Sequence, residues 1–364
     1  SVTYPFMTRK FFKYSDQTTL DVLSSLTNNK KLIGVLTGQW GDYGLPPSQS
    51  SFAMHALVAG HYLDGGNYPQ GTSRKIAETI SNVIEKNGGT LAVNAGVQEV
   101  LTSKGTAVGV LMENGDKIKS NFVISGAGVA NTYTKLMSEN NKLIQSVDKK
   151  MKKVKGTGSY VCLHIGLNKS IQDMMIKNTN LWIYPGYDHD QSLKHYIDNP
   201  RSEFPLVYVS FPSAKDDSWD KNHPNSGTIE AIIPSQISWY SNWQNTNWKK
   251  RGSEYDLHKE KLSKGILEVV LKHVPEIKNS IDFHELSTPL TVKSLANYSN
   301  GEMYGLDHSP RRFRQRWLRP SSGMKNLFFT GQDVTTVGVS SALFSGLLTA
   351  SAVLKKDLSI LLKN

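Results

Sequence analysis

The C-terminal part of the chain has the clearest hydrophobic pattern. A short apolar run at residues 327–330 is followed by Gly331 and Asp333, and then by Gly338 and an uncharged stretch to Leu354. This order predicts a buried strand, a turn and a helix that packs under a sheet. Because a helix N-terminus presents free N–H groups, the turn suits a nucleotide, with Asp333 free to accept hydrogen bonds from sugar or ribityl hydroxyls. A βα unit that binds no ligand is the alternative.

The same uncharged stretch must be compared with a membrane span. Residues 334–354 are about long enough to cross a bilayer. However, the stretch is rich in Ser, Thr and Gly, and its first residues favour a loop. We therefore predict a buried helix, which Lys355 and Lys356 close because cations suit a helix C-terminus.

Periodic patterns elsewhere predict further helices and strands. Helices are expected at 18–26, with Ser15 or Asp16 as N-cap, and at 51–62, 73–87 and 255–273. Gly88 and Gly89 end the third of these. Strand-like segments are found at 90–93, 97–101, 107–111, 117–119, 122–125, 159–166, 206–212 and 228–234.

Aromatic residues and the one cysteine refine this picture. Six of the seven tryptophans lie between Trp182 and Trp317, which indicates either a pocket for a hydrophobic ligand or a well-filled core. Cys162 lies in a predicted strand, so we expect a buried structural thiol. A single cysteine excludes a disulfide framework and Cys-based metal sites, and no metal site is expected.

The formal net charge of +11 is concentrated in three clusters, at 149–155, 249–251 and 311–319. In the last cluster, basic residues alternate with Phe313, Trp317 and Leu318, a pattern that suits an anionic membrane surface. A solvated face is the alternative. Nucleic-acid binding is not expected, because the chain carries no recognised nucleic-acid-binding signature.

Several catalytic and nucleotide-binding motifs are absent from the sequence. It contains no phosphate-binding P-loop, no His-Glu-x-x-His zinc helix and no Gly-x-Ser-x-Gly nucleophile turn. A strand–Gly-x-Gly-x-x-Gly–helix unit is also absent, since Gly34, Gly38 and Gly41 have the wrong spacing. The dinucleotide fingerprint therefore cannot be assigned to this chain.

Two distant segments nevertheless resemble one family. Residues 55–71 (HALVAGHYLDGGNYPQG) and 330–338 (TGQDVTTVG) are similar to the retinol saturases, which belong with the carotenoid isomerases and phytoene desaturases. Residues 211–216, 250–255 and 304–308 resemble the same family. The resemblance extends from about residue 30 to the C-terminus.

The resemblance implies an α/β fold, with a discontinuous Rossmann-like FAD-binding domain and an inserted α+β substrate domain. Residues 64–135 and 281–364 would form the FAD domain, and residues 1–63 and 136–280 the substrate domain. Family members carry a Gly-x-Gly-x-x-Gly βαβ unit upstream of the matching region. We therefore expect a fragment that lacks its N-terminal half, or a second chain that supplies it, and weak or no FAD binding by this chain alone.

The resemblance also implies cofactor-binding residues. Gly331 and Asp333 would lie at the ribityl–pyrophosphate stretch, and Val97 would lie on the strand that meets the adenosine end. Residues near the flavin ring would contribute backbone N–H groups from the helix start: Val337, Gly338 and Val339. The loop on the substrate side of the flavin would contribute Gly65, Gly66, Tyr68 and Gly71. Thr72 stands where the family often has glycine.

The function implied is that of an FAD-dependent oxidoreductase that reduces or isomerises a double bond of a hydrophobic polyene, a retinoid or carotenoid. Candidate proton donors are Tyr68, His61 and Tyr304, and NAD(P)H is a candidate electron donor. A cytoplasmic, peripherally membrane-associated protein is expected. The alternative is a truncated, non-catalytic fragment that binds a lipid or a protein partner.

Overall fold

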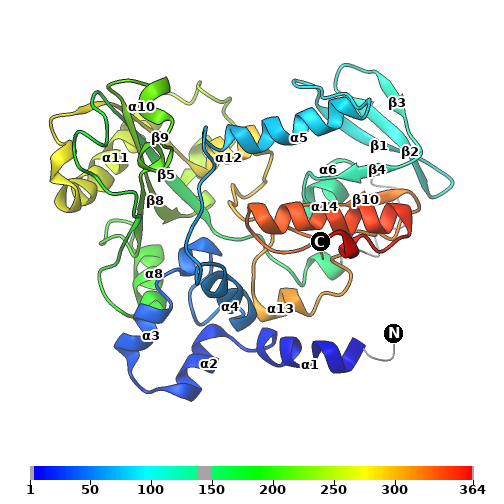
Figure 1. Ribbon diagram of the computed structural model, residues 1–364, viewed down its shortest axis with the longest axis horizontal. Coiled ribbons are helices and arrows are strands. Elements are labelled where there is room, and N and C mark those ends of the chain that lie inside the picture. Colours follow the sequence, from blue (N-terminus) through cyan, green and yellow to red (C-terminus); the bar gives the residue numbers. More distant parts are fainter. Residues whose placement is uncertain (1–3, 138–146, 148, 363–364) are drawn as a thin grey trace.

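The computed structural model describes residues 4–137, 147 and 149–362, and Figure 1 shows how their elements are arranged. Residues 138–146 and 148 fall in the expected substrate domain and lie outside the described residues, as do 1–3 and 363–364. The described chain has a five-stranded sheet on one side and two smaller sheets on the other, with α5 (Arg74–Lys86) between them.

The five-stranded sheet is antiparallel throughout, with the strands in the order β6-β7-β8-β5-β9. Its strands are β5 (Ser159–Leu167), β6 (Leu181–Ile183), β7 (Val207–Ser210), β8 (Gly227–Ser235) and β9 (Ile281–Ser287). Alternate residues of β5, among them Val161, Leu163 and Ile165, are almost fully buried, as the two-residue period of a strand requires. β9 pairs with β5, so the sheet extends past the expected domain limit at residue 280.

Helices cover the buried face of this sheet. α11 (Ser253–His273) contributes Ile266 and Val270 to the core, and α12 (Pro289–Ala296) contributes Leu290. Trp239 and Trp243 also pack against this core, which accords with the well-filled core that the sequence left open. Shorter helical elements complete this half: α8 (His189–Asp198), α9 (Pro212–Lys215), α10 (Trp219–Asn222), η2 (Ile237–Trp243) and η3 (Pro275–Ile277).

The other half contains an antiparallel sheet and a parallel strand pair. The strands are β1 (Val97–Ser103), β2 (Thr106–Met112), β3 (Lys117–Lys119), β4 (Val123–Ser125) and β10 (Leu327–Phe329). Segment 90–93 forms no strand, contrary to the sequence prediction. The core between these strands and α6 (Val129–Lys135) includes Val100, Tyr133, Leu327 and Phe329.

Helix α14 (Val339–Leu354) begins where the sequence predicts, but it is not buried. It packs against β10 through small polar residues, since Thr349 donates to the Phe329 carbonyl and Ser345 is fully buried. Several of its larger apolar residues are exposed, among them Leu343 at 53% and Phe344 at 44%. Among the residues that the structure describes, no helix combines the length and apolar character that a membrane crossing requires.

The N-terminal helices form a separate layer along one edge of the molecule (Figure 1). They are α1 (Tyr4–Ser15), α2 (Thr19–Leu26), α3 (Lys30–Leu36), η1 (Trp40–Asp42) and α4 (Phe52–His61). Thr18, rather than Ser15 or Asp16, caps α2, because it forms a reciprocal capping box with Asp21. Two short elements, α13 (Pro310–Phe313) and η4 (Ser359–Leu362), complete the described chain.

Candidate active site

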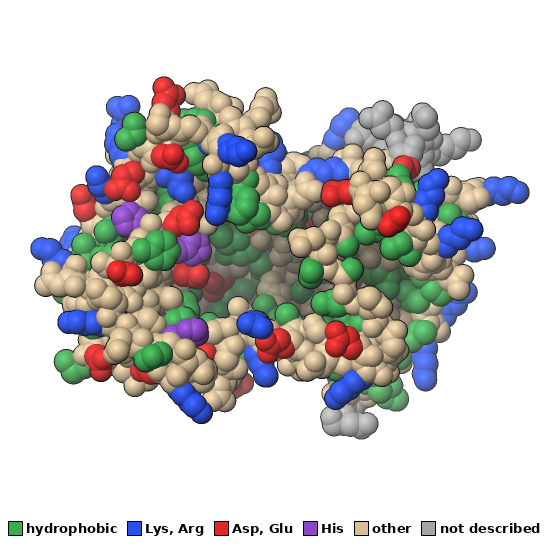
Figure 2. Space-filling view, turned by 90° about the horizontal axis from the view of Figure 1, so that it is seen from above, with side chains coloured by type: hydrophobic (Ala, Val, Ile, Leu, Met, Phe, Trp, Pro, Cys, Tyr) green, Lys and Arg blue, Asp and Glu red, His purple; other side chains and the backbone are tan. Residues whose placement is uncertain are grey.

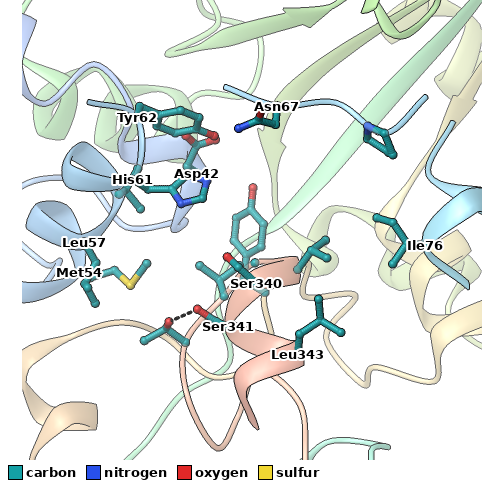
Figure 3. Close-up of a pocket in the computed structure, with 17 residues that line it drawn as sticks. Asp42, Met54, Leu57, His61, Tyr62, Asn67, Ile76, Ser340, Ser341 and Leu343 are labelled. Carbon is teal, nitrogen blue, oxygen red and sulfur yellow. Dashed lines mark hydrogen bonds between the residues drawn. The ribbon is translucent and has the colours of Figure 1, made fainter. Parts of the chain in front are cut away.

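A cavity of about 700 Å³ lies where the N-terminal helices meet the start of α14. Figure 2 shows the molecule hollowed near its centre, with hydrophobic side chains in the depth of the hollow and charged side chains around its rim. The cavity wall combines residues of η1, α4, the loop after α4, α5 and α14. Met54, Leu57 and Leu343 give it an apolar surface (Figure 3), which suits a hydrophobic ligand.

The start of α14 forms one wall of the cavity. Gly338 precedes the helix with a φ of 107°, in the region that favours glycine, and no described side chain caps the helix there. Val339 and Ser340 follow it into the cavity wall. The positive end of the helix dipole is therefore directed at the cavity and favours negative charge on a bound group.

The loop before α14 is fixed by buried side chains. The Val337 N–H donates to Nε2 of His308 at 3.0 Å, so this amide is already engaged rather than free for a cofactor. His308 is fully buried. Burial and the neighbouring Arg312 hold the pKa of His308 well below its ordinary value, so its ring stays neutral and can accept this hydrogen bond.

Asp333 also fixes the backbone, and the expected free carboxylate is not observed. Its side chain is 3% exposed, and its two oxygens accept hydrogen bonds from the N–H groups of Val129 at 2.8 Å and Leu306 at 2.9 Å. Gly305 passes so close that a Cβ there would overlap Asp333. Asp333 therefore joins three distant segments, and the sequence could not show that both oxygens are engaged.

The basic cluster at 311–319 is partly structural as well. Arg312 is 4% exposed and donates to the carbonyl oxygens of Gln332 and Asp333. Arg314 pairs with Asp16 at 2.9 Å. In the 249–251 cluster, Arg251 is also buried and donates to Leu290 O and Ser294 Oγ. These arginines hold loops together, whereas Arg311, Arg316 and Arg319 are exposed.

A polar group lies at one end of the cavity. Asp42, His61, Tyr62 and Asn67 approach one another there, above the start of α14 (Figure 3). Burial raises the pKa of the Asp42 carboxyl to about 6. A half-buried carboxyl with a raised pKa, in a cavity, is typical of a general acid. Sequence reasoning missed Asp42, because it stands in a Gly-rich loop without a motif.

The predicted proton donors are placed differently from one another. His61 and Tyr304 line the cavity, whereas Tyr68 is not among its lining residues. The Tyr304 hydroxyl donates to the Gly41 carbonyl at 2.9 Å, and burial raises its pKa well above the ordinary value. The Lys215 ammonium lies 5.9 Å from the centroid of the Tyr68 ring. Asp42 is therefore better suited to donate a proton than either tyrosine.

The Gly-rich loop after α4 leaves room for a ligand. Gly65 and Gly71 have φ angles of 90° and 85°, and a Cβ at either would meet no atom within 4 Å. The Gly71 N–H donates to Asp216, which ties the loop to the five-stranded half. Thr72 has a φ of 68°, so the position where the family often has glycine keeps a glycine-like conformation here. The open glycines and the uncapped helix fit the ring end of a flavin.

The predicted cofactor residues thus separate into four groups. Residues of the first group line the cavity: Val337, Gly338 and Val339. Gly65, Gly66, Tyr68 and Gly71 belong to the loop that enters the cavity wall through Asn67 and Pro69. Gly331 and Asp333 precede the cavity segment, and the Gly331 N–H donates to Ser345 Oγ. Val97 lies on β1, paired with Met112, outside the cavity.

The chain is similar to known proteins over most of its length. No protein-family model matches it. It is 34% identical over 365 residues to the all-trans-retinol 13,14-reductase of Homo sapiens, with 97% of the chain and 60% of that protein covered. A zebrafish (Danio rerio) relative described as an inactive all-trans-retinol 13,14-reductase is 31% identical over 96% of the chain and 59% of its own length. The phytoene desaturase of Neurospora crassa is 23% identical over 86% of the chain and 52% of its own length. The chain thus spans about 60% of the length of the reductases.

Solved structures share the fold. A putrescine oxidase bound to putrescine superposes with a TM-score of 0.61 at 12% identity, covering 94% of this chain and 69% of its own. An oxidoreductase from Methanosarcina mazei gives a TM-score of 0.58 at 12% identity, covering 93% and 68%. At this identity, the likeness concerns the mixed α/β fold alone.

Proposed function

Because the chain belongs to the retinol saturase and phytoene desaturase-like family, we propose that it forms the substrate-facing part of an FAD-dependent oxidoreductase. The substrate class is a hydrophobic polyene such as a retinoid, and the reaction is reduction of one double bond. The observation that carries this proposal is a carboxyl with a raised pKa, Asp42, in an apolar cavity at the uncapped start of α14.

The residues that would hold the flavin ring are those at the helix start and in the glycine loop. The N–H groups of Gly338 and Val339 and the positive end of the α14 dipole favour negative charge on the ring. Gly65 and Gly71 leave space for its other face. A bound flavin supplies hydride chemistry that no side chain can supply. The Rossmann-like arrangement of the flavin domain is part of this proposal.

Asp42 completes the reaction. Reduction of a double bond adds a hydride to one carbon and a proton to the other. Below pH of about 6 Asp42 is mostly protonated, because burial disfavours its carboxylate. Tyr62 and Asn67 lie near it in the same wall (Figure 3). The carboxyl therefore holds a proton at the polar end of a cavity whose remaining surface is apolar.

The direction of the reaction and the electron donor belong to the same proposal. Saturation needs a proton donor, whereas isomerisation without net reduction does not, so Asp42 favours reduction. NAD(P)H is the proposed source of electrons. A non-catalytic role in lipid binding is the second candidate, and the relative described as inactive makes a direct assay necessary.

The test is an anaerobic incubation of the full chain with FAD, NADPH and all-trans-retinol. We expect a product that has gained two hydrogens and whose polyene absorbs at a shorter wavelength. The rate of its formation should fall as pH rises through about 6. Asp42→Asn should lower the rate about a hundredfold or more, and Asp173→Asn, on an exposed turn, should not. Unchanged retinol in the presence of bound flavin would refute the proposal. If the product is an isomer of retinol, the reaction is isomerisation rather than reduction.

We further propose that the protein is cytoplasmic and contacts membranes peripherally, as access to a lipid-soluble polyene requires. The surface best suited to this contact is the end of α2 together with α3. Leu26, Val35 and Leu36 are exposed there, beside Lys30 and Lys31. Apolar residues flanked by lysines suit an anionic lipid surface.

A further inference from the structure

A cysteine, a histidine and a glutamate converge on the half-buried face of the five-stranded sheet. The alternation of β5 directs Cys162 and His164 to the face opposite the hydrophobic core. The strand register places His164 directly across from Glu230 of β8. Three side chains with different ligand atoms are thereby brought together by strand pairing, and the proposed oxidoreductase chemistry uses none of them.

The spacing of their ligand atoms fits a tetrahedral metal centre. His164 Nδ1 lies 3.9 Å from Cys162 Sγ and 3.4 Å from Glu230 Oε1. The ligand atoms all lie within 4.8 Å of one another. With ordinary zinc bond lengths, a tetrahedral arrangement separates sulfur and nitrogen by about 3.6 Å, and nitrogen and oxygen by about 3.3 Å. The two distances from His164 Nδ1 are therefore within about 0.3 Å of those in a tetrahedral zinc site.

The second nitrogen of His164 is also engaged in the manner of a metal ligand. Its Nε2 lies 3.0 Å from Ser287 Oγ of the adjacent strand β9. A hydrogen bond at the remote nitrogen fixes the orientation and tautomer of a ligating imidazole. Ser287 thus directs Nδ1 toward Cys162 and Glu230.

The charges of the cluster suit a divalent cation. A thiolate and a carboxylate together neutralise two positive charges. The Lys215 ammonium is hydrogen-bonded to Asn180 and Ser210.

We propose that Cys162, His164 and Glu230 bind a divalent cation of the zinc class, with the fourth coordination position open to water or a ligand. The mixed sulfur, nitrogen and oxygen donors favour zinc over magnesium or calcium, which prefer oxygen alone. The single cysteine led the sequence analysis to exclude Cys-based metal sites and to expect no metal, but a mixed site of the kind proposed here needs only one thiolate. Glu230 is far from Cys162 in the sequence. The register of β5 and β8 brings the two residues together.

The test is a titration of the full chain with Co²⁺, a spectroscopic substitute for zinc. Cys162 is the one cysteine of the sequence, so a cobalt–thiolate charge-transfer band can arise only from this site. We expect one such Co²⁺ per chain, displaced by Zn²⁺. His164→Gln and Glu230→Gln should each weaken binding about tenfold or more, and Ser287→Ala about tenfold. The absence of the thiolate band would overturn the proposal.

A matched control is available on the same half of the molecule. His284 lies 3.3 Å from Glu260 in a comparable pair, and among the described residues that pair is not part of a cluster with a cysteine. His284→Gln should leave the cobalt band unchanged. A second measurement needs no variant: Zn²⁺ should slow the reaction of Cys162 with a thiol reagent in the native chain. Equal rates with and without Zn²⁺, or equal affinity in His164→Gln, would reduce the cluster to an ordinary ion pair beside a thiol.

Discussion

Two aspartates of this chain show how burial decides what a carboxyl group does. Asp333 is buried and accepts two backbone hydrogen bonds, so it holds three segments together. Asp42 lines the cavity, and burial raises the pKa of its carboxyl. The sequence indicated Asp333, which follows a strand and a glycine. It did not indicate Asp42, whose environment is formed by side chains that are distant in the sequence.

His308 gives a prediction at the same scale. Its pKa in the folded chain lies well below the ordinary value of about 6.5. As pH falls through about 6.5, the unfolded chain binds a proton that the folded chain does not bind, so the free energy of unfolding falls. His308→Gln keeps an acceptor for the Val337 N–H and does not titrate. The variant should therefore lose less stability than the wild type between about pH 7 and 5, by up to about 1.4 kcal/mol per pH unit.

Denaturant unfolding at several pH values measures this difference. His273→Gln, at the exposed end of α11, is the control and should keep the slope of the wild type. A slope for His308→Gln equal to that of the wild type would show that His308 is already charged in the folded chain or contributes nothing to the acid response.

Individual elements could be predicted where a regular period and a stop signal agree. The helix expected at 73–87 is α5, Arg74–Lys86, ended by Gly88 with its positive φ. The prediction of a strand at 90–93 was wrong, because a short apolar segment becomes a strand only if a partner strand is present. The prediction that α14 is buried was also wrong, since small residues allow close packing on one face of a helix without burying the other face.

Helix α3 carries the prediction at the element scale. Val35 is 66% exposed beside two lysines, and such a surface should bind anionic lipid. Val35→Glu should weaken binding of the full chain to phosphatidylserine vesicles, because it adds repulsion and removes apolar contact. Val83→Glu on α5, where the wild-type side chain is 59% exposed, should leave binding unchanged. Cosedimentation with vesicles measures the binding of each variant. Equal binding by wild type and Val35→Glu would show that α3 is not the membrane contact.

On the scale of the whole molecule, the sequence supported two halves but not the way in which they meet. The resemblance over 55–71 and 330–338 indicated both sides of the cavity, 259 residues apart at their nearest ends (330 minus 71). Some of the contacts that fix the cavity wall are backbone hydrogen bonds to single polar side chains, such as Gly71 to Asp216 and Val337 to His308. Such pairs leave no periodic signal, so only the folded structure reveals them.

The measurement that tests the account most directly is a titration of the full chain with FAD and with FMN, followed by flavin fluorescence. The account places the ring end of the flavin in the cavity, and the chain lacks the dinucleotide fingerprint. We therefore predict weak binding of similar strength for both flavins, abolished by Ser340→Trp, which fills the cavity, and retained in Gly346→Trp on the exposed face of α14. Unchanged fluorescence with the wild-type chain, or equal binding by Ser340→Trp, would contradict the account.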